Sequence, residues 1–211
     1  MAAPAGLGRI GTLQIETAGE YAGDNGSVCA AAALPLGTNG FTAGAGAGWN
    51  GTENSGIFQI STCYVVTGDP IGFMEGLYGP SVTTGASASY EYNDSTDSSE
   101  ISLDCGFQFS LFPSFALGVN CTDATGDAIF KTGFSHVFNR NLKVHVNYGD
   151  ETWQGGAELT VKPSLRIISG TDGSSFSGGL LYTFNRWTAG YSARFFETSI
   201  EHSLGFSGRF P

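Results

Sequence analysis

Hydrophobic and polar residues alternate with a period of two along most of this chain. Near the C-terminus Ile200, Leu204 and Phe206 share one parity, whereas Glu201 and Ser203 share the other. Successive side chains of a strand point to opposite faces, so this alternation predicts strands with one apolar face and one polar face. No segment shows a convincing 3.6-residue period. We therefore expect an all-β fold.

The alternation predicts fourteen strands, with a range of 12–15. Most of them are near the ~9–11 residues that a tilted strand needs to cross a bilayer. The expected strands span residues 10–17, 27–36, 40–50, 56–66, 81–92, 99–111, 114–121, 127–138, 142–149, 153–161, 164–169, 175–184, 187–196 and 199–210.

Tight and longer connections alternate along the chain, which indicates an up-and-down order of antiparallel strands. Short turns then lie on one side and longer acidic loops, such as residues 93–100, on the other. Residues 67–80 are the exception, because they form a longer connection on the short-turn side. We interpret them as a plug or an excursion on that side, ranked ahead of an extra strand. The plug candidates are Phe73, Met74, Leu77 and Tyr78.

Composition favours a transmembrane β-barrel over a soluble barrel or sandwich, which would give the same alternation. Only 13% of the 211 residues are charged, 32 are Gly, and the polar parity is dominated by Gly, Ser, Thr and Asn. A solvated soluble surface carries more charge. Aromatic residues also gather at strand ends, where an interfacial girdle would lie. The length fits a single domain over residues 1–211, with residues 1–9 as an N-terminal segment.

The remaining composition excludes two other classes of protein. A net charge of −10 argues against a nucleic-acid partner. No run approaches 18 consecutive apolar residues, so no membrane-spanning helix is expected. Residues 1–11 lack the basic and apolar regions of a secretory signal. Either the protein has no such signal, or the signal has been removed and Met1 added.

Residues 202–210, His-Ser-Leu-Gly-Phe-Ser-Gly-Arg-Phe, resemble the terminal strand of outer-membrane β-barrels such as porins. The match departs from that pattern at Gly208, where a large hydrophobe is usual, and at Pro211, which follows the terminal aromatic. The resemblance implies contact with membrane lipid and recognition by the barrel-insertion machinery through Ser199 to Phe210. It implies an outer membrane and is compatible with a homo-oligomer. The acidic balance and the style of the loops favour a bacterial membrane over a mitochondrial or plastid one, whereas the four cysteines favour an organelle.

On the barrel interpretation the polar parity faces the lumen, where small residues leave space for a pore. Arg9 is the only basic residue before residue 127, whereas residues 127–211 contain eight. A mixed-charge constriction could then select small hydrophilic solutes. The alternative is that these charges pair across strands and only stabilise the wall. The candidates for lining the lumen are Asp104, Lys131, Lys143, His145, Glu158, Arg166, Arg194, Glu201 and Arg209.

Two rival functions remain open at this point: a plugged membrane barrel with a binding, structural or assembly role, and a soluble all-β binding or coat protein. The chain contains no Gly-x-Ser-x-Gly or His-Glu-x-x-His motif. We therefore predict no catalytic residue, no metal site and no cofactor. A membrane-embedded hydrolase or acyltransferase, with His145 as a general base, is a less favoured alternative.

The four cysteines lack the spacing of a metal site. Reflecting the strands about the turn at residues 112–114 places Cys105 nearly opposite Cys121 with the same parity. The sequence thus predicts a cross-strand disulfide between them. Cys29 and Cys63 are separated by an intervening strand, so we expect no bridge there.

Overall fold

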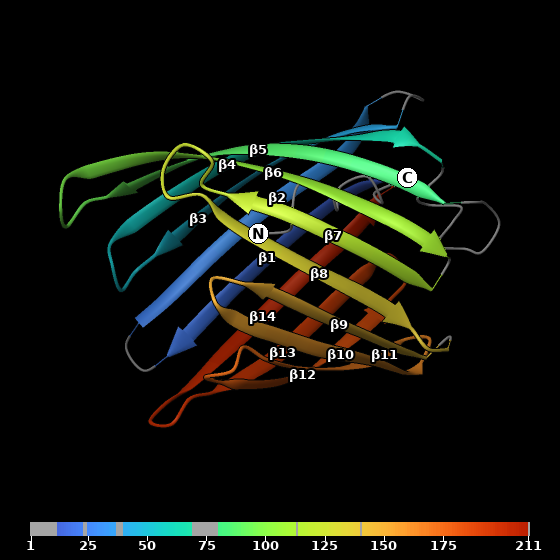
Figure 1. The fold of residues 1–211 in the computed structure, drawn as a ribbon. Helices are drawn as coiled ribbons and strands as arrows, with labels where there is room; N and C mark the ends of the chain where they lie inside the picture. Colours follow the sequence, from blue (N-terminus) through green and yellow to red (C-terminus); the bar gives the residue numbers. More distant parts are fainter. Residues whose placement is uncertain are drawn as a thin grey trace.

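The computed structural model describes residues 12–22, 25–36, 40–68, 80–112, 114–139 and 141–210. These residues form fourteen antiparallel strands that close into one up-and-down barrel, which confirms the predicted fold class (Figure 1). The N-terminal segment 1–9 and the plug candidates Phe73, Met74, Leu77 and Tyr78 lie outside the described residues. The strands are β1 (Leu13–Ala22), β2 (Asn25–Leu36), β3 (Phe41–Asn50), β4 (Ser55–Thr67), β5 (Ser81–Asn93), β6 (Ser98–Phe112), β7 (Phe115–Thr122), β8 (Ile129–Val137), β9 (Leu142–Gly149), β10 (Thr152–Lys162), β11 (Leu165–Thr171), β12 (Phe176–Phe184), β13 (Trp187–Phe195) and β14 (Ile200–Phe210).

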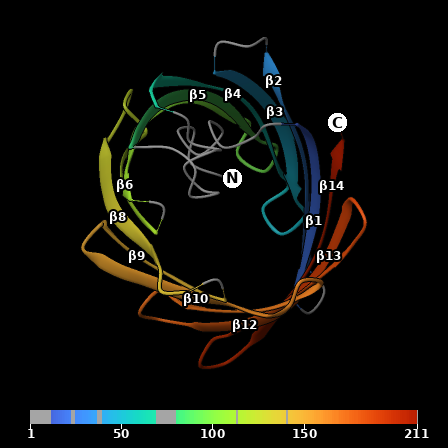
Figure 2. The same cartoon turned by 90° about the vertical axis from the view of Figure 1, so that its right-hand side faces the viewer.

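The barrel closes where the first strand pairs with the last (Figure 2). The pairing of β1 with β14 runs from Leu13 opposite Phe210 to Tyr21 opposite His202. The other edge of β1 pairs with β2 from Gln14 to Ala22. Closure leaves no strand with a free edge, so the ladder satisfies backbone N–H and C=O groups that lipid could not.

The two ends of the barrel differ. At one end, here called the turn end, residues 138–141, 163–164 and 185–186 join the strands. At the opposite end, the loop end, the connections include residues 51–54, 94–97 and 123–128. The acidic side chains Asp94, Asp97 and Asp127 lie at the loop end, as predicted.

Thirteen of the strand predictions agree with the structure to within two residues at each boundary. The prediction for β1 was wrong, because residues 10–17 were expected and the strand spans Leu13–Ala22. Residues 18–22 were assigned to the loop that follows, yet they belong to the strand, where Glu20 faces the lumen and the backbone pairs with β2 and β14. The connection from β1 to β2 is therefore only residues 23–24.

The outer face of the barrel is apolar on every strand. Aliphatic side chains such as Leu180 and Leu204 occupy the middle of their strands and are 50% and 66% exposed. Large aromatic side chains lie toward the strand ends, as in a transmembrane barrel with an aromatic girdle at each interface. They include Tyr21, Trp49, Trp153, Phe176 and Phe195 toward the loop end, and Tyr64, Phe112 and Phe184 toward the turn end. The described residues contain no helix that could span a membrane.

Candidate functional site: the barrel lumen

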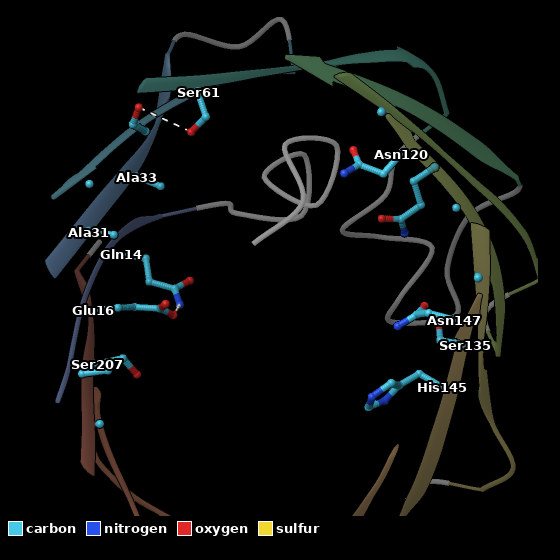
Figure 3. Close-up of a pocket in the computed structure, with 18 of the residues that line it drawn as sticks. Gln14, Glu16, Ala31, Ala33, Ser61, Asn120, Ser135, His145, Asn147 and Ser207 are labelled. Carbon is cyan, nitrogen blue, oxygen red and sulfur yellow. Dashed lines mark hydrogen bonds between the residues drawn. The ribbon is translucent and has the colours of Figure 1, made fainter. Parts of the chain in front are cut away.

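The lumen contains a cavity of about 980 Å³, lined by residues of β1 to β4 and β6 to β14. Its walls differ in character (Figure 3). Ala31, Ala33, Gly44 and Gly46 give β2 and β3 a smooth surface. Larger polar groups cover the wall formed by β6 to β10. These are Gln108, Asn120, Ser135, His145, Asn147 and Gln154.

Several of the larger polar side chains lie along the wall, across a glycine of the neighbouring strand. Asn120 is the register partner of Gly106, and a β-carbon on Gly106 would lie 2.6 Å from Asn120 Oδ1. His145 is the register partner of Gly156, where an added β-carbon would lie 2.5 Å from its Cε1 atom. These glycines keep the polar side chains flat against the wall. The lumen is therefore wider than its residue types alone would suggest.

Three charged residues on adjacent strands form a cluster near the turn end of the lumen. Lys143 on β9 is the register partner of Glu158 on β10. The Arg166 guanidinium on β11 donates to Glu158 Oε1 at 3.1 Å. Arg209 on β14 lies opposite Gln14 of β1, also near the turn end. Among the described residues, neither Lys143 nor Arg209 forms an ion pair.

Two more predicted residues lie toward the loop end. Asp104 on β6 accepts hydrogen bonds from Ser87 Oγ at 3.2 Å and from the backbone N–H of Asp123 at 3.0 Å. These contacts hold its carboxylate against the wall. Lys131 on β8 lines the cavity, and its side chain lies across Gly149 of β9.

Arg194 near the end of β13 is held by the connection between β11 and β12. Its Nε donates to Ser175 Oγ at 2.8 Å and its Nη2 pairs with the Asp172 carboxylate. The guanidinium also lies 4.8 Å from the centroid of the Phe196 ring. Glu201 is the register partner of Arg194 on β14. These contacts place Arg194 at the rim of the loop end.

The nine predicted lumen residues thus fall into two groups. Lys131, Lys143, His145, Arg166 and Arg209 line the cavity, whereas Asp104, Glu158, Arg194 and Glu201 are not among its lining residues. The predicted set of lumen residues left out several residues that line the cavity, either because they are uncharged or because they lie on β1. They share the polar parity, which is the signal that could have found them. These residues are Gln14, Glu16, Gln59, Gln108, Asn120, Asn147 and Gln154.

The contact between Asp172 and its neighbours predicts a pH-dependent loop. Hydrogen bonds from the Ser174 hydroxyl and backbone N–H, and then from Ser175, hold the pKa of Asp172 well below its usual range. A lowered carboxyl pKa stabilises the folded state above the unfolded value of about 3.9, and this contribution is lost as pH falls toward the folded pKa. We expect the connection between β11 and β12 to keep its contact with Arg194 at pH 5–7 and to lose it only in stronger acid.

This expectation can be checked by following the Asp172 carboxyl carbon by NMR during an acid titration. Its midpoint should lie clearly below that of an ordinary aspartate. The Arg194 side-chain resonances should shift over the same pH range, and in an Asp172→Asn variant they should not. A normal Asp172 midpoint would contradict the contact.

Cys105 and Cys121 are direct cross-strand partners, as the reflected register predicted. Both are free thiols in the structure, with Cys121 buried and Cys105 exposed. The disulfide between them stays a prediction. Cys29 and Cys63 lie on β2 and β4, with β3 between them.

No known family model and no curated protein sequence matches the chain. Solved structures of bacterial β-barrels are similar to it over nearly their full length. The outer membrane protein Omp33 of Acinetobacter baumannii has a TM-score of 0.72 at 12% identity, covering 96% of this chain and all of that one. The CymD monoaromatic hydrocarbon channel gives 0.68 at 13% identity, covering 98% and 91%. The KdgM porin gives 0.55 at 10% identity, covering 94% and 99%. The predicted resemblance to porin-like barrels is confirmed at the level of the fold.

Proposed function

We propose that this chain is a pore of a bacterial outer membrane through which small hydrophilic solutes pass passively. The observation that carries the proposal is the cavity of about 980 Å³ inside a closed barrel whose outer face is apolar. An apolar exterior with aromatic girdles and a polar interior is the pattern of transmembrane barrels with water-filled channels. The similarity to solved outer-membrane proteins supports the same location.

The lining favours hydrophilic solutes over hydrocarbons. Solved barrels of similar fold include a monoaromatic hydrocarbon channel and a porin in complex with oligogalacturonate, so the fold alone does not choose between these classes. Asn147, Gln154 and His145 offer amide and imidazole groups along one wall of this lumen. Such groups replace water around a polar solute, whereas a hydrocarbon would leave them without partners.

We infer a single barrel domain over residues 1–211 whose outer face contacts lipid. Exposed large hydrophobic side chains occur on every strand, so lipid can contact the whole circumference. Interaction with the barrel-insertion machinery is assigned to β14, whose outward Leu204, Phe206 and Phe210 match the expected alternation. A homo-oligomer would need part of this outer face to be covered, which a cross-linking experiment in native membranes would detect.

Planar-bilayer recording of the refolded chain tests the proposal. We expect stable single-channel steps, together with osmotic swelling of liposomes in small sugars. Detergent-dependent folding without conductance or swelling would contradict the pore and favour a closed barrel with a binding or structural role. A chain that folds and stays monodisperse without detergent would contradict the membrane location.

A further inference from the structure

We propose that the turn end of the lumen is a binding site for small oxyanions, such as carboxylates and phosphates, formed by Lys143, Arg166 and Arg209. The inference rests on the proposed pore and names the class of solute that the pore recognises. The phosphate of lipids is out of reach of this site, because the three side chains line the lumen rather than the outer face.

The three basic residues lie at one level of the barrel. Lys143 and Arg166 are the second residues of β9 and β11, and Arg209 is the penultimate residue of β14. All three positions adjoin the turn end, and all three side chains line the same cavity. A solute that crosses the lumen must therefore pass them together.

The carboxylates at this level leave positive charge uncompensated. Glu158 lies between Lys143 and Arg166 and is paired with Arg166 at 3.1 Å. Glu16, on the opposite wall, is the other acidic residue at this level among those that the structure describes, and it accepts a hydrogen bond from Gln14. Since Lys143 and Arg209 form no ion pair within the described part of the chain, their charges are free to bind an anion.

Charge of the opposite sign predominates at the other end. The lumen-facing parity toward the loop end carries five acidic residues, Glu20, Glu91, Glu100, Asp104 and Glu201, against the two basic residues Lys131 and Arg194. The chain as a whole is acidic, with a net charge of −10. The excess of positive charge at the turn end is therefore a local feature of the lumen and is opposite in sign to the net charge of the chain. It also implies that anions reach the site more readily from the turn end.

The geometry suits an oxyanion in particular. Arg166 is oriented by Glu158, so its planar guanidinium is held before an anion arrives, and Lys143 adds a flexible point charge beside it. Gln14, Ser207 and Thr188 line the same cavity and can donate further hydrogen bonds. Charge-assisted hydrogen bonds to carboxylate or phosphate are about twice as strong as neutral ones.

Inorganic phosphate is the probe for the first test, with the full chain folded in detergent micelles. Its ³¹P resonance should broaden on addition of the protein, with a half-saturation that can be titrated. We expect Lys143→Gln to weaken phosphate binding roughly fivefold through loss of one ionic contact. Glu158→Gln should strengthen binding by a similar factor, because the amide oxygen can still accept the hydrogen bond that orients Arg166 while the competing negative charge is removed. Strengthening is an outcome that loss of folding cannot produce.

Lys162→Gln provides the matched control. It removes the same charge near the turn end, from an exposed residue of β10 that is not among the lining residues of the cavity. Phosphate binding should be unchanged in this variant. Equal weakening by Lys143→Gln and Lys162→Gln would overturn the site, since it would show only a general effect of net charge.

Bilayer recording gives the second test. Phosphate should reduce the single-channel chloride current more strongly from one compartment than from the other, and Lys143→Gln should lessen that block. Stable conductance without phosphate binding, or without sided block, would overturn the anion site and leave the pore intact. Phosphate binding without conductance would support the site and contradict the pore.

Discussion

Replacing Leu204 by Arg should destabilise the barrel by about 2–4 kcal/mol. Leu204 lies in the middle of β14 on the outer face and is 66% exposed, the position at which a lipid-facing charge is most costly. Urea titration of the protein in lipid vesicles, followed by tryptophan fluorescence, would give the free energy of unfolding. A change below about 1 kcal/mol would contradict the orientation of the barrel in lipid.

Ser203→Arg is the matched control, because it places the same side chain one residue away on the lumen face. Ser203 is the register partner of Glu20 on β1. An Arg at this position can pair with Glu20 across the strands, so we expect a loss below about 1 kcal/mol. Its effect should instead appear as a reduced single-channel conductance. The pair of variants separates the lipid face from the lumen face at adjacent positions.

Gly179→Ala should destabilise the protein by about 1–3 kcal/mol, because β12 and β13 leave no room for a β-carbon. On Gly179 that atom would lie 2.5 Å from the backbone oxygen of Tyr191 and 2.7 Å from Ser192 Cβ. Both contacts belong to the adjacent strand, so the ladder between β12 and β13 must shift. The free energy of unfolding in vesicles measures the effect.

The neighbouring Gly178→Ala variant tests the same chemical change where space is available. The nearest atom to a β-carbon on Gly178 is Phe176 Cε1, at 3.9 Å. We expect no loss, or a gain of about 0.5–1 kcal/mol from reduced backbone freedom of the unfolded chain. Similar losses in both variants would contradict the tight approach of β12 and β13.

The fold was predictable because each strand carries its own evidence. Alternation in Leu204, Phe206 and Phe210 against Ser203 and Ser207 needs no knowledge of the rest of the chain. The register of Cys105 with Cys121 was also predictable, because a short turn connects their strands. The ladder is irregular between Ser110 and Phe112, but from Ser110 opposite Ala116 to Cys105 opposite Cys121 the two strands are still related by reflection about residue 113.

The arrangement of side chains inside the lumen was less predictable. The parity of a residue tells which face of the strand it lies on, but not its height along the barrel axis or the side chain that it contacts. Arg194 has the parity of the lumen. Because it lies near the loop end of β13, however, it pairs with Asp172 in the connection between β11 and β12. Asn120 is one of several amides of the same parity. Only its register with Gly106 shows that it lies flat against the wall.

The pairing of β1 with β14 determines when the barrel can form. β1 is synthesised before its partner β14, so no complete barrel exists until residue 210 has been synthesised. Until then β1 presents an unpaired edge that could add strands from other chains. An incomplete chain must therefore be kept apart from its neighbours until β14 is available to pair with β1.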